Sequence, residues 1–146
     1  MKFHKPDVEK LLGIKGTRLH EWIKFGYIKK FVAPGHGYKY ELELFDLYTI
    51  VFLENLIAQG IPRQYAGEMA QLMRKHVEKK KLQNNLPKYF AFGEKLSETK
   101  PKVRTGVTVT SFNEYKEQEI NWLGQEFDNI IIVNFYKITK EVDAKV

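Results

Sequence analysis

The chain contains no cysteine among its 146 residues. Disulfide bridges, thiolate metal sites and cysteine redox sensing are therefore excluded. Histidine is also scarce, and the four histidines are scattered without the spacing of metal ligands: His4, His20, His36 and His76. We expect a protein without a bound metal and without a cofactor.

Long apolar runs are missing too. No purely apolar stretch exceeds about six residues, whereas a membrane-spanning helix needs ~20. Residues 1–7 lack the apolar segment of a signal peptide. From this sequence we expect a soluble, cytoplasmic protein with no membrane partner.

Groupings of catalytic side chains are also absent. The sequence shows no nucleophile–base pair, no glycine-rich phosphate loop and no metal-ligand cluster. Several carboxylates gather late in the chain, but no histidine, serine or glycine-rich loop accompanies them: Glu114, Glu117, Glu119, Glu126 and Asp128. We expect them on the exposed face of a helix, and we expect no enzymatic activity.

Positive charge is concentrated in one segment. Residues 1–40 hold nine lysines and arginines against three acids, a net charge of +6 that equals the net charge of the whole chain. The remaining residues therefore sum to zero. A basic imbalance confined to one small segment predicts a local surface for a polyanion such as nucleic acid.

The first half of the sequence predicts short helices followed by a hairpin. Pro6 and Asp7 open a first helix that ends at Gly13. A second helix has Leu19, Trp22 and Ile23 on its inner face, and Gly26 supplies the left-handed residue that closes it. The elements expected here are a helix over 17–25, a strand over 27–32, a turn over 34–37 and a returning strand from 38 to 40.

The pattern changes from helical to alternating after residue 85. Helices are expected over 44–59 and, after Gly60-Ile61-Pro62, up to the lysines at 79–81. We place a domain boundary in the turn at 84–87, which gives domains 1–85 and 86–146. The second domain is expected to be a β-β-α-β unit, with strands over 89–93 and 103–112, a helix over 114–126 and a buried strand over 130–136. The fold class is therefore α+β.

An ordered set of motifs carries a family resemblance. It comprises Gly13-Ile14, Leu19-His20, Trp22, Gly26-Tyr27-Ile28, Gly37-Tyr38-Lys39-Tyr40, Asp46-Leu47 and Gly60-Ile61-Pro62. In this order they resemble the winged helix-turn-helix DNA-binding domain of MerR-type transcriptional regulators, over residues 5–75. The resemblance implies a nucleoid-associated homodimer on a near-palindromic site in double-stranded DNA, with helix 17–25 in the major groove and a wing at 34–40 on the backbone.

Candidate DNA contacts follow from that docking geometry. A recognition helix presents its first two turns to base edges, while basic flanks neutralise phosphates. The residues expected to contact bases are Thr17, Arg18, His20 and Glu21, and Arg18 is best suited to guanine. Those expected to hold the backbone are Lys15, Lys24, Lys29, Lys30, His36, Tyr38 and Lys39.

Other functions remain open from the sequence. The protein could be an architectural or accessory factor of a phage or mobile element, acting in excision or packaging. Alternatively, residues 86–146 could bind a protein or small-molecule effector, with DNA as a tether. Because no long coiled-coil helix follows Val77, we hypothesise that the strand at 130–136, or the helix before it, forms the dimer. The operator and the direction of regulation stay undetermined.

Overall fold

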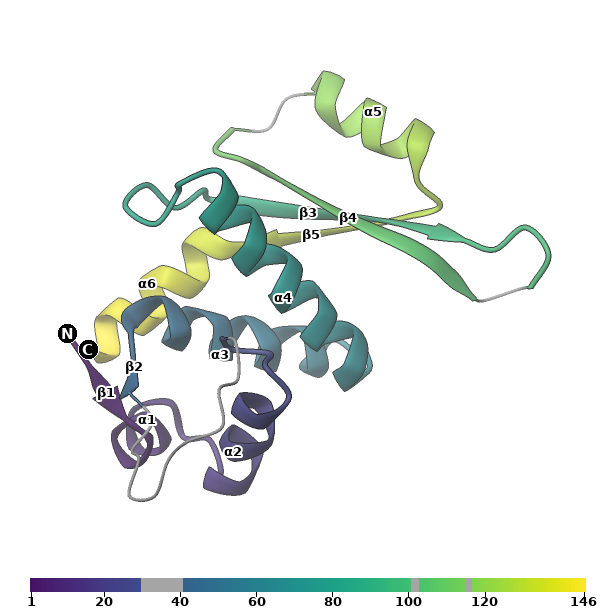
Figure 1. Ribbon diagram of the computed structural model, residues 1–146. Helices are drawn as coiled ribbons and strands as arrows, with labels where there is room; N and C mark the ends of the chain where they lie inside the picture. Colours follow the sequence, from purple (N-terminus) through teal and green to yellow (C-terminus); the bar gives the residue numbers. More distant parts are fainter. Residues whose placement is uncertain (30–40, 101–102, 115–116) are drawn as a thin grey trace. The chain divides into compact units, whose positions relative to one another are not determined.

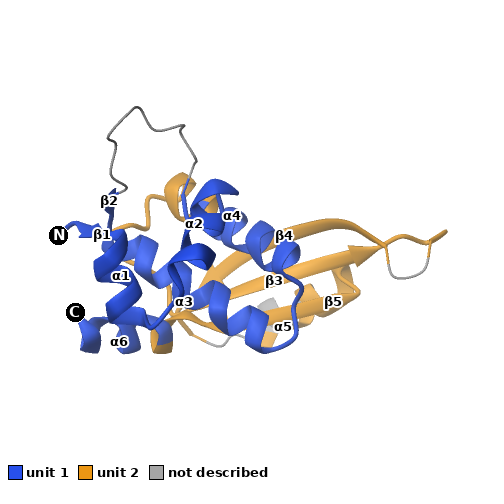
Figure 2. Ribbon diagram, turned by 90° about the horizontal axis from the view of Figure 1, so that it is seen from below, with its two compact units in different colours: residues 1–74, 138–146 blue, residues 75–137 orange. Residues whose placement is uncertain are grey.

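The computed structural model describes residues 1–29, 41–100, 103–114 and 117–146, except for the side chains of residues 118–120 and 122 (Figure 1). The chain is α+β, as expected. It divides into two compact units, coloured separately in Figure 2. Unit 1 comprises residues 1–74 and 138–146, and unit 2 comprises residues 75–137.

Two short helices joined by a tight turn begin unit 1. Helix α1 (Lys5–Leu12) is capped by the Asp7 carboxylate, whose Oδ2 accepts the His4 backbone N–H at 3.1 Å. Gly13 ends α1 in the left-handed region at φ 64°, and α2 (Gly16–Lys24) starts after Ile14 and Lys15. Only three residues, 13–15, therefore separate the two helices.

Helix α2 ends in a Schellman motif, in which backbone N–H groups after the helix bond to its last carbonyls. Gly26 has φ 74°, its N–H donates to Ile23 O, and the Tyr27 N–H donates to Trp22 O. This confirms the expected left-handed role of Gly26.

Helix α3 (Leu44–Ala58) contributes six buried hydrophobic side chains to the core of unit 1. Its fully buried side chains include Leu47, Ile50, Phe52 and Leu53. Helix α4 (Arg63–Lys79) follows Gly60, which has φ 95°. Figure 1 shows helices α3 and α4. Strand β1 (Phe3–His4) pairs antiparallel with strand β2 (Glu41–Leu42).

Unit 2 contains a three-stranded antiparallel sheet. Strand β3 (Tyr89–Leu96) lies between β4 (Arg104–Phe112) and β5 (Asn129–Asn134), as Figure 2 shows. Helix α5 (Glu117–Glu126) connects β4 to β5, so the expected order β-β-α-β is confirmed. The core of unit 2 is aromatic: Phe90 packs edge-to-face on Phe135, with ring centroids 5.1 Å apart.

The strand expected over 27–32 does not form in its described part. Residues 27–29 are bends instead of a strand. Ile28 is fully buried, and the Lys29 ammonium donates to the Glu41 carbonyl. These side-chain contacts hold the segment in place of the backbone hydrogen bonds that were expected between two strands. The rest of that strand, the wing at 34–40 and the returning strand lie outside the described residues.

The end of the chain differs from the expectation. The last strand stops at Asn134, and residues 135–145 form helix α6 (Phe135–Lys145), which the sequence analysis missed. Asn134 caps this helix, because its Oδ1 accepts the Lys137 backbone N–H at 3.1 Å. The strand is also less buried than expected, with Ile132 47% exposed.

The division into units falls elsewhere than the expected boundary. The turn at 84–87 lies inside unit 2, and the division occurs within α4 between residues 74 and 75. Residues 138–146 rejoin unit 1, where Tyr48 Oη donates to Asp143 Oδ1 at 2.6 Å. Turn-forming residues mark where the chain bends, whereas this division follows packing between distant segments.

Candidate nucleic-acid interface

Helix α2 has one buried face and one exposed face. Leu19, Trp22 and Ile23 are at most 1% exposed, which confirms Trp22 as a core residue. The opposite stripe is exposed at positions spaced by three and four residues, which share one helix face: Thr17, His20, Glu21 and Lys24. We call these four residues the α2 stripe. All four were expected in the interface.

The N-terminus of α2 combines opposite charges. Lys15 is the exposed residue preceding the helix and makes no side-chain cap. The Glu9 carboxylate lies so close to Gly16 that a β-carbon there would clash with it. A carboxylate at this end interacts favourably with the helix dipole. Glu9 therefore stabilises α2, and Gly16 leaves room for it.

Arg18 lies at the edge of the α2 stripe and is held within unit 1. Its Nη2 is 3.4 Å from Glu54 Oε2 on α3, and its Cζ is 5.0 Å from the centre of the Trp22 ring. The Arg18 side chain is 30% exposed, and its buried Nε has no hydrogen-bond partner among the described residues. The guanidinium expected at guanine is thus turned toward α3.

A second ion pair lies nearby. Arg63 Nη1 on α4 is 3.6 Å from Glu21 Oε2. Both ion pairs line one open cleft of about 610 Å³ at the α1–α2 turn. Its wall also includes Lys15 and Thr17, so the cleft borders the α2 stripe. Glu54 and Arg63 come from distant helices, and no local motif in the sequence marks them.

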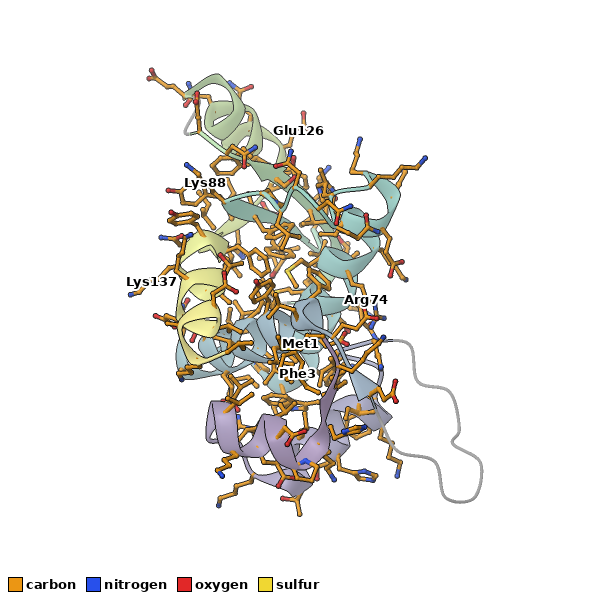
Figure 3. The ribbon with its side chains drawn as sticks, turned by 90° about the vertical axis from the view of Figure 1, so that its left-hand side faces the viewer. Met1, Phe3, Arg74, Lys88, Glu126 and Lys137 are labelled. Carbon is orange, nitrogen blue, oxygen red and sulfur yellow. The ribbon has the colours of Figure 1, made fainter. Side chains whose placement is uncertain are left out.

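The segment after α2 is held by α4. The Gly26 carbonyl accepts bonds from Gln71 Nε2 at 3.3 Å and from Arg74 Nη2 at 3.4 Å; Arg74 is labelled in Figure 3. The Tyr27 ring lies against Gly67, where any β-carbon would clash with it. These contacts fix the direction in which the chain leaves α2 toward residue 30.

The remaining expected contacts divide into two groups. Lys29 is partly buried, and its ammonium is engaged by the Glu41 carbonyl. Lys30, His36, Tyr38 and Lys39 lie outside the described residues. Of the residues expected to contact DNA, the structure therefore brings together those of the α2 stripe and Lys15 at the N-terminus of α2.

No protein-family model matches the chain, and a search of curated proteins found no match. Within the described residues, no group of histidines and carboxylates could hold a metal ion. The helices of that same part of the chain are too short or too polar to cross a membrane.

Proposed function

We propose that the chain is a sequence-specific, double-stranded DNA-binding protein with a MerR-like winged helix-turn-helix. In this proposal it is a cytoplasmic protein that regulates transcription. One observation carries the proposal. The exposed α2 stripe lies on a short helix after a three-residue turn, within the segment that holds the net charge of the chain. This combination suits a helix that enters the major groove.

The α2 stripe offers donors and acceptors suited to base edges. Thr17 and His20 can donate or accept hydrogen bonds, and the Glu21 carboxylate can accept from the cytosine amino group. Lys15 and Lys24 flank these residues and supply charge for phosphates. Lys30 and Lys39 add charge in the segment where the wing is proposed.

Arg18 has two roles in this proposal. Paired with Glu54, it links α2 to α3 and holds the recognition helix on the core. Beside a guanine, it would exchange the single contact to Glu54 for a bidentate pair with O6 and N7. We propose a homodimer, because a near-palindromic site has two half-sites and each copy would supply the recognition helix for one of them.

Selection of bound duplexes from a random library tests the proposal. We expect one enriched sequence with two-fold symmetry, and Thr17→Ala and His20→Ala should each relax the preference at one base pair. An enriched site repeated in clusters would instead favour an architectural factor. Recovery of no enriched sequence would overturn the proposal.

A further inference from the structure

Strand β5 forms one edge of the sheet in unit 2. It pairs with β3 on one side, and no described strand pairs with its other side. Its sequence, Asn-Ile-Ile-Ile-Val-Asn, holds no charged residue. Proteins usually protect such an edge with charge, proline or a bulge, because its free backbone groups can pair with another chain.

The opposite edge of the same sheet is protected. Strand β4 begins with Arg104, and its register against β3 shifts between Lys95 and Leu96. Threonines occupy positions 105, 108 and 110. The sheet thus has one polar, irregular edge and one apolar, regular edge. Only β5 has the character of a pairing edge.

Ile132 is the most exposed apolar side chain of β5, at 47%. It lies opposite Ala91 on β3, and the next residue of β3 on that face, Gly93, lies opposite Thr108 on β4. Ile132 and Thr108 therefore project on the same face of the sheet from its two edges. An exposed isoleucine on one edge strand and an exposed threonine on the other therefore lie on the same face of the sheet, at neighbouring positions of β3.

We infer that β5 pairs antiparallel with β5 of a second copy of this chain, joining two three-stranded sheets into one. Opposite residues in an antiparallel pair project on the same face, so a two-fold axis must set one residue against its own copy. An axis at Ile132 covers its exposed side chain with the second Ile132 and sets Ile131 opposite Val133.

Self-pairing suits this strand for an electrostatic reason as well. In a symmetric strand pair, a charged residue near the two-fold axis lies close to the same residue of the second copy. Like charges directly opposite each other are destabilising. The six residues of β5 carry none. The inference rests on the proposed function only for the existence of a dimer, and it locates the interface in unit 2, away from α2 in the sequence.

Disulfide trapping tests the pairing directly, because the natural chain has no cysteine. Opposite residues of an antiparallel pair have Cα atoms about 4.5–5.5 Å apart, within the range a disulfide spans. Under mild oxidation without DNA, Ile132→Cys should form a covalent dimer on a non-reducing gel. The matched Thr108→Cys variant on the other edge should form at least about tenfold less, since random encounters alone would link it.

Sedimentation of the full chain at micromolar concentration supplies a second readout. The wild type and Thr108→Lys should sediment as dimers, whereas Ile132→Lys should sediment as a monomer with unchanged circular dichroism. A monomeric wild type, or equal cross-linking of the two cysteine variants, would overturn the inference. DNA is absent from both assays, so a failure of DNA binding would leave these results standing and would refute only the proposed function.

Discussion

Arg18 and Glu54 form an ion pair that links the flank of helix α2 to helix α3, with Arg18 Nη2 3.4 Å from Glu54 Oε2. The two side chains are 30% and 35% exposed, so water partly screens the pair. In the proposed complex this pair would compete with DNA for Arg18, the one arginine of α2. Glu54 would therefore hold Arg18 back from the proposed DNA contact, although it comes from a helix far along the chain.

Glu54→Gln should increase DNA affinity. The change removes a negative charge beside the interface and frees Arg18, so affinity for the selected duplex should rise by about threefold to tenfold, and the preference for guanine at the base pair that Arg18 contacts should sharpen. Fluorescence anisotropy with the selected duplex, and with a duplex in which that guanine is replaced, measures both effects. The matched control is Glu126→Gln, an exposed carboxylate of α5 in unit 2, labelled in Figure 3. Unchanged or weaker binding of Glu54→Gln would contradict the assigned role.

Lys81→Gly should stabilise the protein. Lys81 has φ 55° and is the only residue other than glycine with a positive φ in the described part of the chain. It occupies the glycine position of a Schellman motif, in which the Leu82 N–H donates to Val77 O at 2.9 Å. Glycine removes the strain of the left-handed conformation from the folded state, but its greater flexibility also stabilises the unfolded chain. Because the first effect is larger, the free energy of unfolding should rise by ~0.5–1 kcal/mol.

Urea unfolding measures this change, and the neighbouring residue supplies a control with the opposite sign. Lys80 does not have the positive φ of Lys81, and its N–H donates to His76 O at the end of α4. Lys80→Gly should therefore lower stability, by up to ~1 kcal/mol. If both variants were destabilised equally, the conformational argument at Lys81 would be wrong.

Asp46→Asn should change how stability depends on pH. Burial raises the pKa of the Asp46 carboxyl above its ordinary value of 3.8, although the Glu43 N–H donated to Oδ2 at 2.7 Å opposes this shift. Between the ordinary and the raised pKa the folded state binds more protons, so the contribution of Asp46 to stability falls as pH rises through this window. Asparagine keeps an acceptor oxygen for the Glu43 N–H and does not titrate.

The stability of Asp46→Asn relative to the wild type should therefore increase from pH 4 to pH 7. Unfolding in urea at several pH values measures the difference. Asp46→Ala separates the two roles of the side chain, because it does not titrate either but also loses the cap of α3. It should therefore be about 1 kcal/mol less stable than Asp46→Asn at every pH. A difference between Asn and wild type that does not vary with pH would show that burial does not raise this pKa.

Local signals in the sequence predicted helices α1 to α4 well. Gly13 and Gly26 mark the ends of α1 and α2, and the spacing of Leu19, Trp22 and Ile23 predicts the buried face of α2. That spacing also leaves the α2 stripe exposed, so this part of the candidate site follows from the sequence. Glycine conformations and helical periodicity act over a few residues, which is why they can be recognised in one sequence.

Contacts between distant residues could not be predicted in the same way. Glu54 follows Arg18 by 36 positions and meets it only when α3 packs beside α2. The Tyr48–Asp143 hydrogen bond joins residues 95 positions apart. Helix α6 was missed because Ile130 to Tyr136 looked like one apolar strand, although Asn134 is a suitable cap and Ile138 and Val142 have helical spacing.

The salt dependence of DNA binding tests the central claim most directly. The selected duplex should be titrated with the wild type, with a Lys15→Ala/Lys24→Ala double variant, and with Lys137→Ala/Lys145→Ala as a charge-matched control on α6. The account predicts that only the α2 variant binds more weakly and that its slope of log K against log salt is shallower by about two phosphate contacts. Equal slopes for all three proteins, or no salt dependence at all, would contradict the claim that α2 binds DNA.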